Sequence, residues 1–260
     1  MTLCVAFRAT DGMVALCDGM TSYAVPKGQH SPPPARLNTR KLCLGPENQS
    51  WVLMCANRNE YKDGSAAIDV AEDLIASLPQ ECENAASLEP VARYIWDHFT
   101  KLEVHHRPGP EAIPDVWSNG SEVERRFEGL LVGYAPAGDG EVEFWTMMAD
   151  GYPPNRCDDD FVGIGSGVDC ARELLTDIRG FDRWYRDAMA QHGCSESVCE
   201  LDTGRAELAA LKGLQLGLTH EHGALAHLDH IVGGNWRSAR IFPGQHPLQR
   251  CHQSWKTTGT

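Results

Sequence analysis

The amino-acid sequence predicts an α+β fold, in which two antiparallel sheets pack between two helical layers as a four-layer αββα sandwich. Strand-like runs come in hairpins, and helices come in pairs between groups of strands. Paired helices argue against a doubly wound parallel sheet, where single helices alternate with strands. Residues 1–260 contain no internal repeat and no linker between compositionally distinct halves, so we expect a single domain.

Two hairpins are predicted in the first part of the chain. Their apolar, strand-like runs lie at residues 3–8 with 13–18, and at 41–44 with 51–56. The first pair is joined through Asp11-Gly12, a strong signal for a short turn. Between the hairpins, residues 23–39 are polar and proline-rich, so this stretch is predicted to be a loop.

Amphipathic helices are expected next, at residues 65–78 and 87–102, because apolar residues recur at helical spacing along one face of each. A Pro/Gly-rich loop is predicted at 107–120, and residues 180–203 fit no periodic pattern. The remaining predicted elements are strands at 130–135, 141–148 and 161–164, helices at about 168–178 and 205–222, and a last strand at 237–242.

The balance of charges limits the possible partners. The chain has a formal net charge of −13 at pH 7, which nucleic acids and anionic membrane surfaces repel, so neither is expected to bind. No apolar run approaches the ~20 residues of a membrane helix, and the first residues lack a signal peptide. The ten cysteines are scattered, several of them in strand-like runs, which is typical of buried thiols in a reducing compartment. We therefore expect a cytoplasmic protein.

The second residue suggests a nucleophile. Thr2 becomes the first residue if Met1 is removed, and a small second residue favours that removal. A threonine hydroxyl needs a base, and the α-amine of an N-terminal threonine, with an unperturbed pKa of about 7.7–8.0, can serve as one. Many unrelated proteins also begin Met-Thr, so this residue alone indicates no more than the start of a strand.

Several other segments strengthen this interpretation because they occur in a fixed order. They are Asp18 at the end of the first hairpin, Lys41 at the start of the second, Met54-Cys55-Ala56-Asn57 before a helix, Leu130 to Tyr134, Gly163-Ile164-Gly165-Ser166-Gly167, and Leu228 to Gly234. In this order they resemble the proteasome β-subunit family of N-terminal-nucleophile (Ntn) hydrolases. The opening without a propeptide is most similar to the ancestral bacterial β-subunit homologues (Anbu-type).

The resemblance implies roles for the matching residues. Thr2 Oγ would attack the scissile carbonyl and form an acyl ester, while its freed amine shuttles the proton. Lys41, held against Asp18, would supply positive charge that favours a neutral amine and a more acidic hydroxyl. The backbone N–H of Asn57 would point at the developing oxyanion, and such a donor is typically worth ~10²–10³ in rate.

Two further positions complete the implied site. Ser166 and Asp229 would hold the N-terminus and a proton-relay water. The sequence departs from the family pattern at three positions: Met20 where a basic residue is frequent, Asn57 in place of a glycine, and Val232 in place of a serine. The missing serine weakens the relay around the amine.

Each position also has an ordinary structural explanation. Taken alone, Asp18 could simply end a strand, and Lys41 could be a solvated charge at a hairpin base. Ser166 could be a helix N-cap, and Asp229 could be a surface residue. The histidines near residue 225 lack the spacing of a metalloprotease motif, so no metal site is predicted, and no cofactor is expected.

The resulting hypothesis is a threonine-type endopeptidase that cleaves peptides or unfolded polypeptides. The resemblance implies a homo-oligomer, either a ring or a stacked ring with active sites facing an interior space, and leaves an ATPase partner open. Two alternatives remain: a catalytically degenerate proteasome-like scaffold subunit, and an Ntn-type amide hydrolase that acts on a small molecule.

Overall fold

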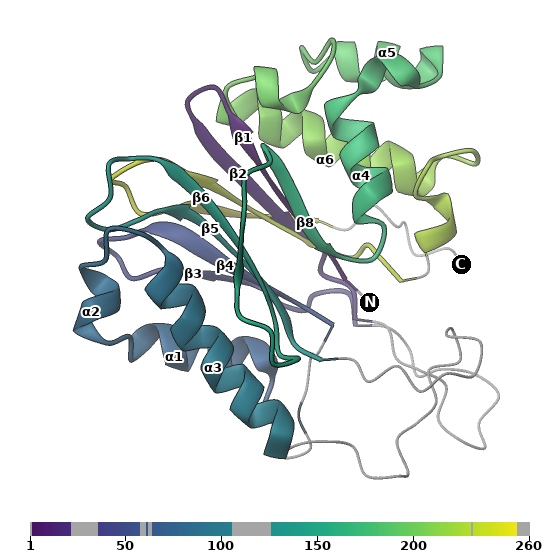
Figure 1. Cartoon of the computed structure of the whole chain (residues 1–260). Coiled ribbons are helices and arrows are strands. Elements are labelled where there is room, and N and C mark those ends of the chain that lie inside the picture. Colours follow the sequence, from purple (N-terminus) through teal and green to yellow (C-terminus); the bar gives the residue numbers. More distant parts are fainter. Residues whose placement is uncertain are drawn as a thin grey trace, which may run out of the picture.

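The computed structural model describes residues 2–21, 36–57, 61, 64–105, 126–229 and 231–253, with the backbone alone at 104 and 105. Its elements form four layers, with two sheets face to face and helices covering the outer face of each (Figure 1). The predicted αββα sandwich of antiparallel sheets is confirmed. The predicted loop at 107–120 and most of the one at 23–39 lie outside the described residues.

The strands form two antiparallel sheets of five. The first sheet has the order β10-β9-β2-β1-β8, and the second has the order β3-β4-β5-β6-β7. The first sheet consists of β1 (Leu3–Ala9), β2 (Gly12–Cys17), β8 (Phe161–Gly165), β9 (Trp236–Ile241) and β10 (Leu248–His252). The second consists of β3 (Leu42–Leu44), β4 (Ser50–Ala56), β5 (Glu128–Tyr134), β6 (Val142–Met148) and β7 (Asn155–Cys157).

The helices divide between the two outer layers. The second sheet is covered by α1 (Ala67–Ala76), α2 (Gln80–Glu83) and α3 (Glu89–His105). The first sheet is covered by α4 (Val168–Thr176), α5 (Arg183–Ala190) and α6 (Thr203–Thr219), with the short 3₁₀ turns η1 (Ile178–Gly180), η2 (Val198–Glu200) and η3 (Ala226–Leu228).

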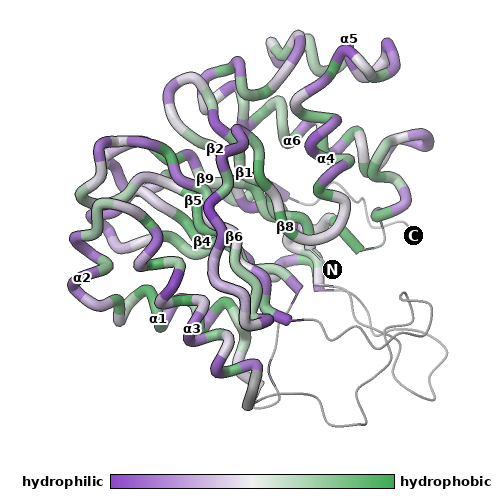
Figure 2. Tube along the Cα trace, in the orientation of Figure 1, coloured by the Kyte–Doolittle hydropathy of each residue, from purple (hydrophilic) through white to green (hydrophobic). Residues whose placement is uncertain are grey.

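The apolar runs of the strands are continuous because both faces of each sheet are buried. Along β1, Leu3, Val5 and Phe7 pack against the α4–α6 layer, while Cys4 and Ala6 pack between the two sheets. Side chains alternate between the faces of a strand, so a strand covered on both sides needs apolar residues throughout. The helices instead alternate apolar and polar residues along their length (Figure 2).

Four elements were not predicted from the sequence, and the prediction that 237–242 is the last strand is wrong because β10 follows it. The edge strands β7 and β10 are short and largely exposed, so they lack the apolar alternation that identifies a strand. The helices α2 and α5 are short, with few buried residues to set a helical period.

Polar contacts attach β10 to the sandwich. The carboxylate of Glu207 on α6 is fully buried and accepts hydrogen bonds from Ser238 and, at 2.6 Å, from Arg240 Nε. Ser238 Oγ lies 2.8 Å from His252 Nε2 on β10. The Glu207 carboxylate therefore binds two residues of β9, and β10 joins this polar cluster through His252, whose Nε2 lies 3.4 Å from Glu207 Oε1.

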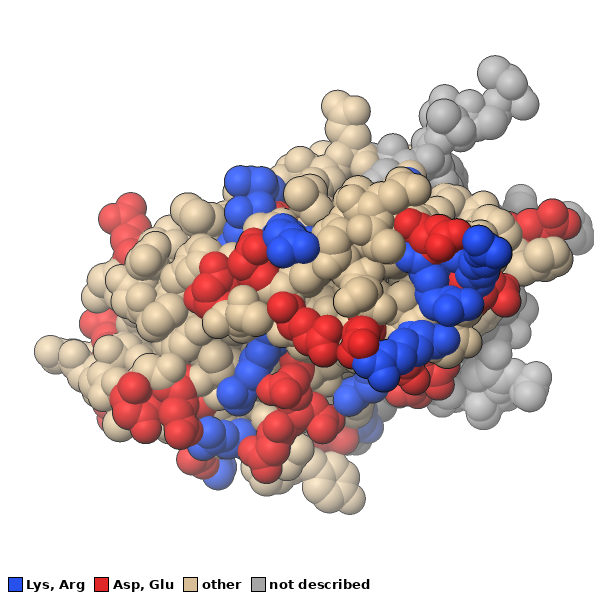
Figure 3. Space-filling model, turned by 90° about the horizontal axis from the view of Figure 1, so that it is seen from above, with Lys and Arg blue, Asp and Glu red and all other residues tan. Residues whose placement is uncertain are grey.

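Acidic and basic side chains alternate on the face seen from above in Figure 3, without a broad basic patch. Ion pairs on the helical layer include Arg172–Asp159 at 3.1 Å and Arg183–Asp187 at 3.7 Å. Among the described residues, none of the helices combines the length and apolar character needed to cross a bilayer.

Candidate active site

Antiparallel pairing brings the candidate residues to one end of the sandwich. The register pairs Leu3 with Gly165, so the residue before β1 lies beside the end of β8. In the second sheet Leu42 pairs with Met54, which places the start of β3 near the end of β4. Thr2, Lys41 and Ser166 adjoin these strand ends, so residues far apart in sequence converge there.

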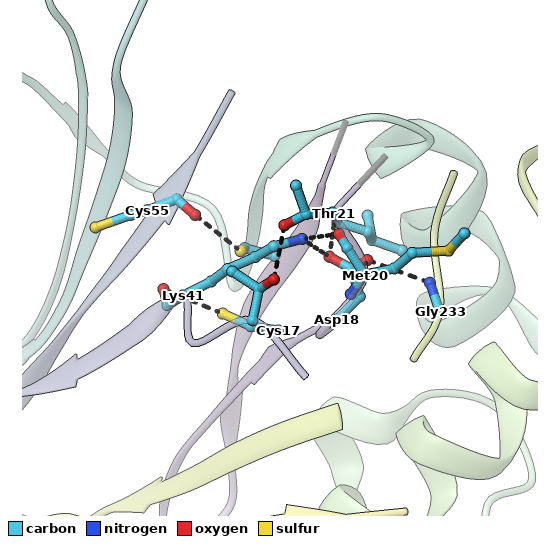
Figure 4. Close-up of polar contacts among 10 residues, drawn as sticks. Cys17, Asp18, Met20, Thr21, Lys41, Cys55 and Gly233 are labelled. Atoms are coloured by element: carbon cyan, nitrogen blue, oxygen red, sulfur yellow. Dashed lines mark hydrogen bonds and ion pairs between the residues drawn. The ribbon is translucent and has the colours of Figure 1, made fainter. Parts of the chain in front are cut away.

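Asp18 and Lys41 form a buried ion pair at this end. Lys41 Nζ lies 2.8 Å from Asp18 Oδ1, and the two side chains are 1% and 0% exposed. The ammonium also donates to the carbonyl of Met20 at 2.6 Å (Figure 4). Burial of a charge is costly unless it is paired and hydrogen-bonded, so this geometry excludes the interpretation of Lys41 as a solvated charge at a hairpin base.

Backbone amides complete the surroundings of Asp18. Oδ1 accepts the N–H of Leu3 at 2.9 Å, and Oδ2 accepts those of Met20 at 3.3 Å and Gly233 at 3.2 Å. One carboxylate oxygen thus binds both the Lys41 ammonium and the peptide N–H that follows Thr2. Asp18 is therefore more than the end of a strand, because it fixes the first residues of β1 relative to the lysine.

Two polar groups of the site have unused hydrogen-bonding capacity among the described residues. Thr2 is fully buried, and its hydroxyl oxygen makes no hydrogen bond. An ammonium has three N–H donors, and Lys41 uses two of them, on Asp18 and Met20. Buried polar groups are rarely left unsatisfied, and the exceptions are frequent in functional sites.

Two thiols lie near the pair. Cys17 Sγ donates to the Lys41 carbonyl at 3.8 Å, and Cys4 Sγ donates to the Cys55 carbonyl at 3.9 Å (Figure 4). Burial raises the pKa of Cys17 well above its ordinary value. Because the thiolate is the reactive form, this environment favours the threonine hydroxyl over the neighbouring thiol as the nucleophile.

The turn after β8 holds the backbone of Thr2. The N–H of Ser166 donates to the Thr2 carbonyl at 2.6 Å. Gly167, in the left-handed conformation, is the N-cap of α4, so the alternative interpretation of Ser166 as a helix N-cap is wrong. Gly165 has φ +87°, and a Cβ there would lie 2.0 Å from the Thr2 carbonyl oxygen. Only glycine permits this approach.

We expect Gly165→Ala to displace Thr2. The added methyl group cannot coexist with the Thr2 carbonyl, and the left-handed backbone adds strain of about 1–3 kcal/mol. Urea unfolding should show a loss of stability of at least this size, and reactivity at Thr2 should fall more than stability accounts for. Gly140→Ala is a matched control, since it has φ +86° but open space around its Cβ. Equal effects of the two substitutions would contradict the contact with Thr2.

Asn57 follows β4 in the left-handed region, with φ 65°. Asparagine tolerates this conformation better than most residues, which explains how it stands at a position where the family pattern has glycine. Its side chain donates from Nδ2 to Glu128 Oε2 at 2.8 Å. The role of its backbone N–H as an oxyanion donor stays a prediction.

The segment from Leu228 to Gly234 returns to the site, as expected from its sequence. The recorded contacts with Asp18 and Gly19 come from the backbone of Gly233, while the side chain of Asp229 is exposed. Val232 is fully buried in the apolar cluster beneath α4–α6. The predicted relay role of Asp229 is not tested by these contacts.

Three contributors to the site were not predicted from the sequence: the Met20 carbonyl, the Gly233 amide and Glu128. The first two act through the backbone, which leaves no signature in residue type. Glu128 begins β5 and pairs in register with Ala56, one residue before Asn57. The sequence signal that could have indicated Glu128 is an acidic residue at the start of one apolar run, opposite the polar residue that ends another.

Comparison with known proteins supports this fold. No protein-family model and no curated protein matches the chain. Among solved structures, a mutant of Anbu from Hyphomicrobium sp. strain MC1 matches with a TM-score of 0.55 at 14% identity, over 97% of this chain and 87% of that one. Anbu, the ancestral β-subunit, from Yersinia bercovieri matches with a TM-score of 0.54 at 14% identity, over 96% and 86%. The predicted resemblance is therefore confirmed at the level of the fold.

Proposed function

We propose that this chain, which has the fold of the ancestral β-subunit structures, is a threonine-type peptidase whose nucleophile is Thr2 after removal of Met1. One observation carries the proposal. The buried Asp18 carboxylate binds, through a single oxygen atom, both the Lys41 ammonium and the amide that follows Thr2. A buried charged pair that binds the peptide group after a threonine with an unpartnered hydroxyl fits a site that activates a weak nucleophile.

The proposed reaction has two steps. In the first, Thr2 Oγ attacks the scissile carbonyl, its proton passes to the free α-amine, and the leaving amine takes up that proton as the peptide bond breaks. In the second, water attacks the resulting ester and restores the hydroxyl, releasing the carboxylic acid. Lys41 favours both steps by placing a positive charge beside the site. In this mechanism the N–H of Asn57 stabilises the oxyanion, and Ser166 and Asp229 hold the N-terminus and its water.

The proposal also covers domain organisation, assembly, substrates and cellular location. We propose that residues 1–260 form one domain, that copies assemble into a ring or stacked ring, and that the substrates are peptides or unfolded polypeptides. All ten cysteines are free and six of them are buried, which supports a reducing, cytoplasmic location. Size-exclusion chromatography with light scattering tests the assembly, and a monomer at micromolar concentration would contradict it.

The proposal requires that Met1 be absent from the mature protein. Intact-mass measurement of the purified chain should give a mass lower by one methionine residue than that of the translated sequence. A Thr2→Glu variant provides the control, because a large second residue blocks removal of the initiator. A retained Met1 in the unmodified chain would leave no free threonine amine and would favour the scaffold alternative.

A scaffold subunit is a second candidate because of Val232. This residue is buried among apolar side chains, so the hydroxyl that the family pattern places there is missing. Fluorogenic peptides and acyl-amino acids, assayed side by side, separate the candidates. Cleavage of peptides supports the peptidase, cleavage of acyl-amino acids alone supports the small-molecule amide hydrolase, and cleavage of neither supports the scaffold.

A further inference from the structure

A carboxylate at the start of β5 joins the two sheets next to the candidate site. Glu128 accepts a hydrogen bond from Asn57 Nδ2 at 2.8 Å, and the backbone N–H of Gly165 lies near enough to the same carboxylate to favour its ionised form. Asn57 follows β4 in the second sheet, and Gly165 ends β8 in the first. Glu128 therefore bridges the turn that carries the proposed oxyanion donor and the strand end that touches Thr2.

The side chain of Glu128 points between the sheets. Its neighbours on the same face of β5, Leu130 and Val132, belong to the cluster packed between the two sheets. The carboxylate is half-buried there, and desolvation raises the pKa of Glu128 above its ordinary value. A residue placed only for stability would seldom be an acid in this position, since burial of an ionised carboxylate lowers stability.

The ionised carboxylate is suited to both donors. It has two oxygens that only accept hydrogen bonds, whereas a glutamine amide offers a single accepting oxygen and an NH₂ group that donates. Glu128 can therefore accept two N–H groups from different sheets on separate oxygens, whereas a glutamine would have to accept both on one oxygen. The left-handed conformation of Asn57 also needs support, since non-glycine residues seldom adopt it.

We propose that Glu128 is a positioning residue, which fixes the Asn57 turn relative to Thr2 by binding Asn57 and Gly165 at once. This inference rests on the proposed function, because the turn matters for the reaction only if Asn57 donates to the oxyanion. Glu128 need not touch the substrate. It acts by fixing the distance between the donor and the nucleophile, and a misplacement of about 1 Å in such a pair can cost 10²-fold in rate.

A double-mutant cycle on the full chain tests the inference, with the acylation rate by a peptide epoxyketone as the readout. We expect Glu128→Ala to slow acylation by roughly 10²-fold. In an Asn57→Gly background the same change should cost roughly threefold or less, because glycine has no side chain for Glu128 to bind and adopts φ > 0 unaided. Glu141→Ala, which removes an exposed acid just before β6, is the control and should leave the rate unchanged.

Glu128→Gln separates positioning from folding. It keeps the side-chain volume, loses one acceptor and removes the desolvated charge. The folded protein binds a proton at Glu128 more readily than the unfolded chain does, so the ionised form lowers stability above its folded pKa. We therefore expect Glu128→Gln to acylate more slowly than the unmodified protein while its Tm at pH 7 is unchanged or higher. A lower Tm with an unchanged rate would assign Glu128 a purely structural role and overturn the inference.

Failure of the inference is distinguishable from failure of the proposed function. If the unmodified protein is acylated at Thr2 and Glu128→Ala reacts equally fast, only the inference fails. If the unmodified protein is not acylated at all, the proposed function fails, and hydrogen exchange then decides on the bridge. The amides of Asn57 and Gly165 should exchange faster in Glu128→Ala than in Glu141→Ala, and equal exchange would contradict the bridge.

Discussion

Replacing Lys41 with methionine is expected to destabilise the fold by roughly 3–5 kcal/mol and to abolish peptide hydrolysis. The methionine side chain fills a similar volume but leaves the Asp18 carboxylate buried without its cation. Three backbone N–H groups still bind this carboxylate, so the protein should fold at low temperature. Urea unfolding measures the stability, and hydrolysis of a fluorogenic peptide measures the activity.

The double variant Asp18→Asn/Lys41→Met separates stability from chemistry. With both charges removed, no uncompensated ion remains in the interior, and the asparagine carbonyl still accepts backbone hydrogen bonds. We expect this variant to recover most of the stability lost by Lys41→Met and to stay inactive. Recovery of activity together with stability would show that the pair supports only the fold. A Lys41→Met protein as stable as the unmodified chain would contradict the burial of a paired charge.

Replacing Thr2 with alanine is expected to lower the rate of peptide hydrolysis by roughly 10⁴- to 10⁶-fold, as the loss of a nucleophile does in other covalent hydrolases. Thr2→Ser is the matched variant, because serine keeps a hydroxyl on the same atom and also permits removal of Met1. We expect the serine variant to retain most of the rate. Fold stability should change little, since the Thr2 hydroxyl makes no hydrogen bond among the described residues.

The outcome for Thr2 distinguishes the two main candidates. A scaffold subunit would show the same low rate for threonine, serine and alanine at this position. A peptidase would show a high rate for the first two and a low rate for the third. If alanine matched threonine at a high rate, another residue would have to be the nucleophile, and the proposed mechanism would be wrong.

The convergence of Thr2, Asp18 and Lys41 was implied by the resemblance to the proteasome β-subunit family, and each of these residues adjoins a strongly apolar strand whose position the sequence predicts. Apolar runs buried on both faces are the clearest signal in a sequence, and the hairpins that join them are short. Once the positions of the strands are known, the positions of the residues at their ends are known as well. The same resemblance implied that the Gly-Ser-Gly turn lies beside Thr2, although the sequence left open whether Ser166 capped a helix.

Other features left too little signal. The edge strand β10 is attached through Glu207, Ser238 and His252, a polar cluster without periodicity. Gly233 reaches Asp18 through its amide, which any residue except proline could supply. The contact between Glu128 and Asn57 depends on the register of β4 against β5, which apolar patterns do not specify to one residue when both faces are buried.

Treatment of the mature protein with a peptide epoxyketone, followed by peptide mapping, tests the central claim most directly. This probe is retained when a threonine hydroxyl adds to its ketone and the α-amine of the same residue opens its epoxide, so it requires both groups on the first residue. We predict a single adduct on Thr2 that disappears in Thr2→Ala and forms much more slowly in Lys41→Met. A protein that has lost Met1, is folded, and still gains no adduct at Thr2 would contradict the proposed mechanism.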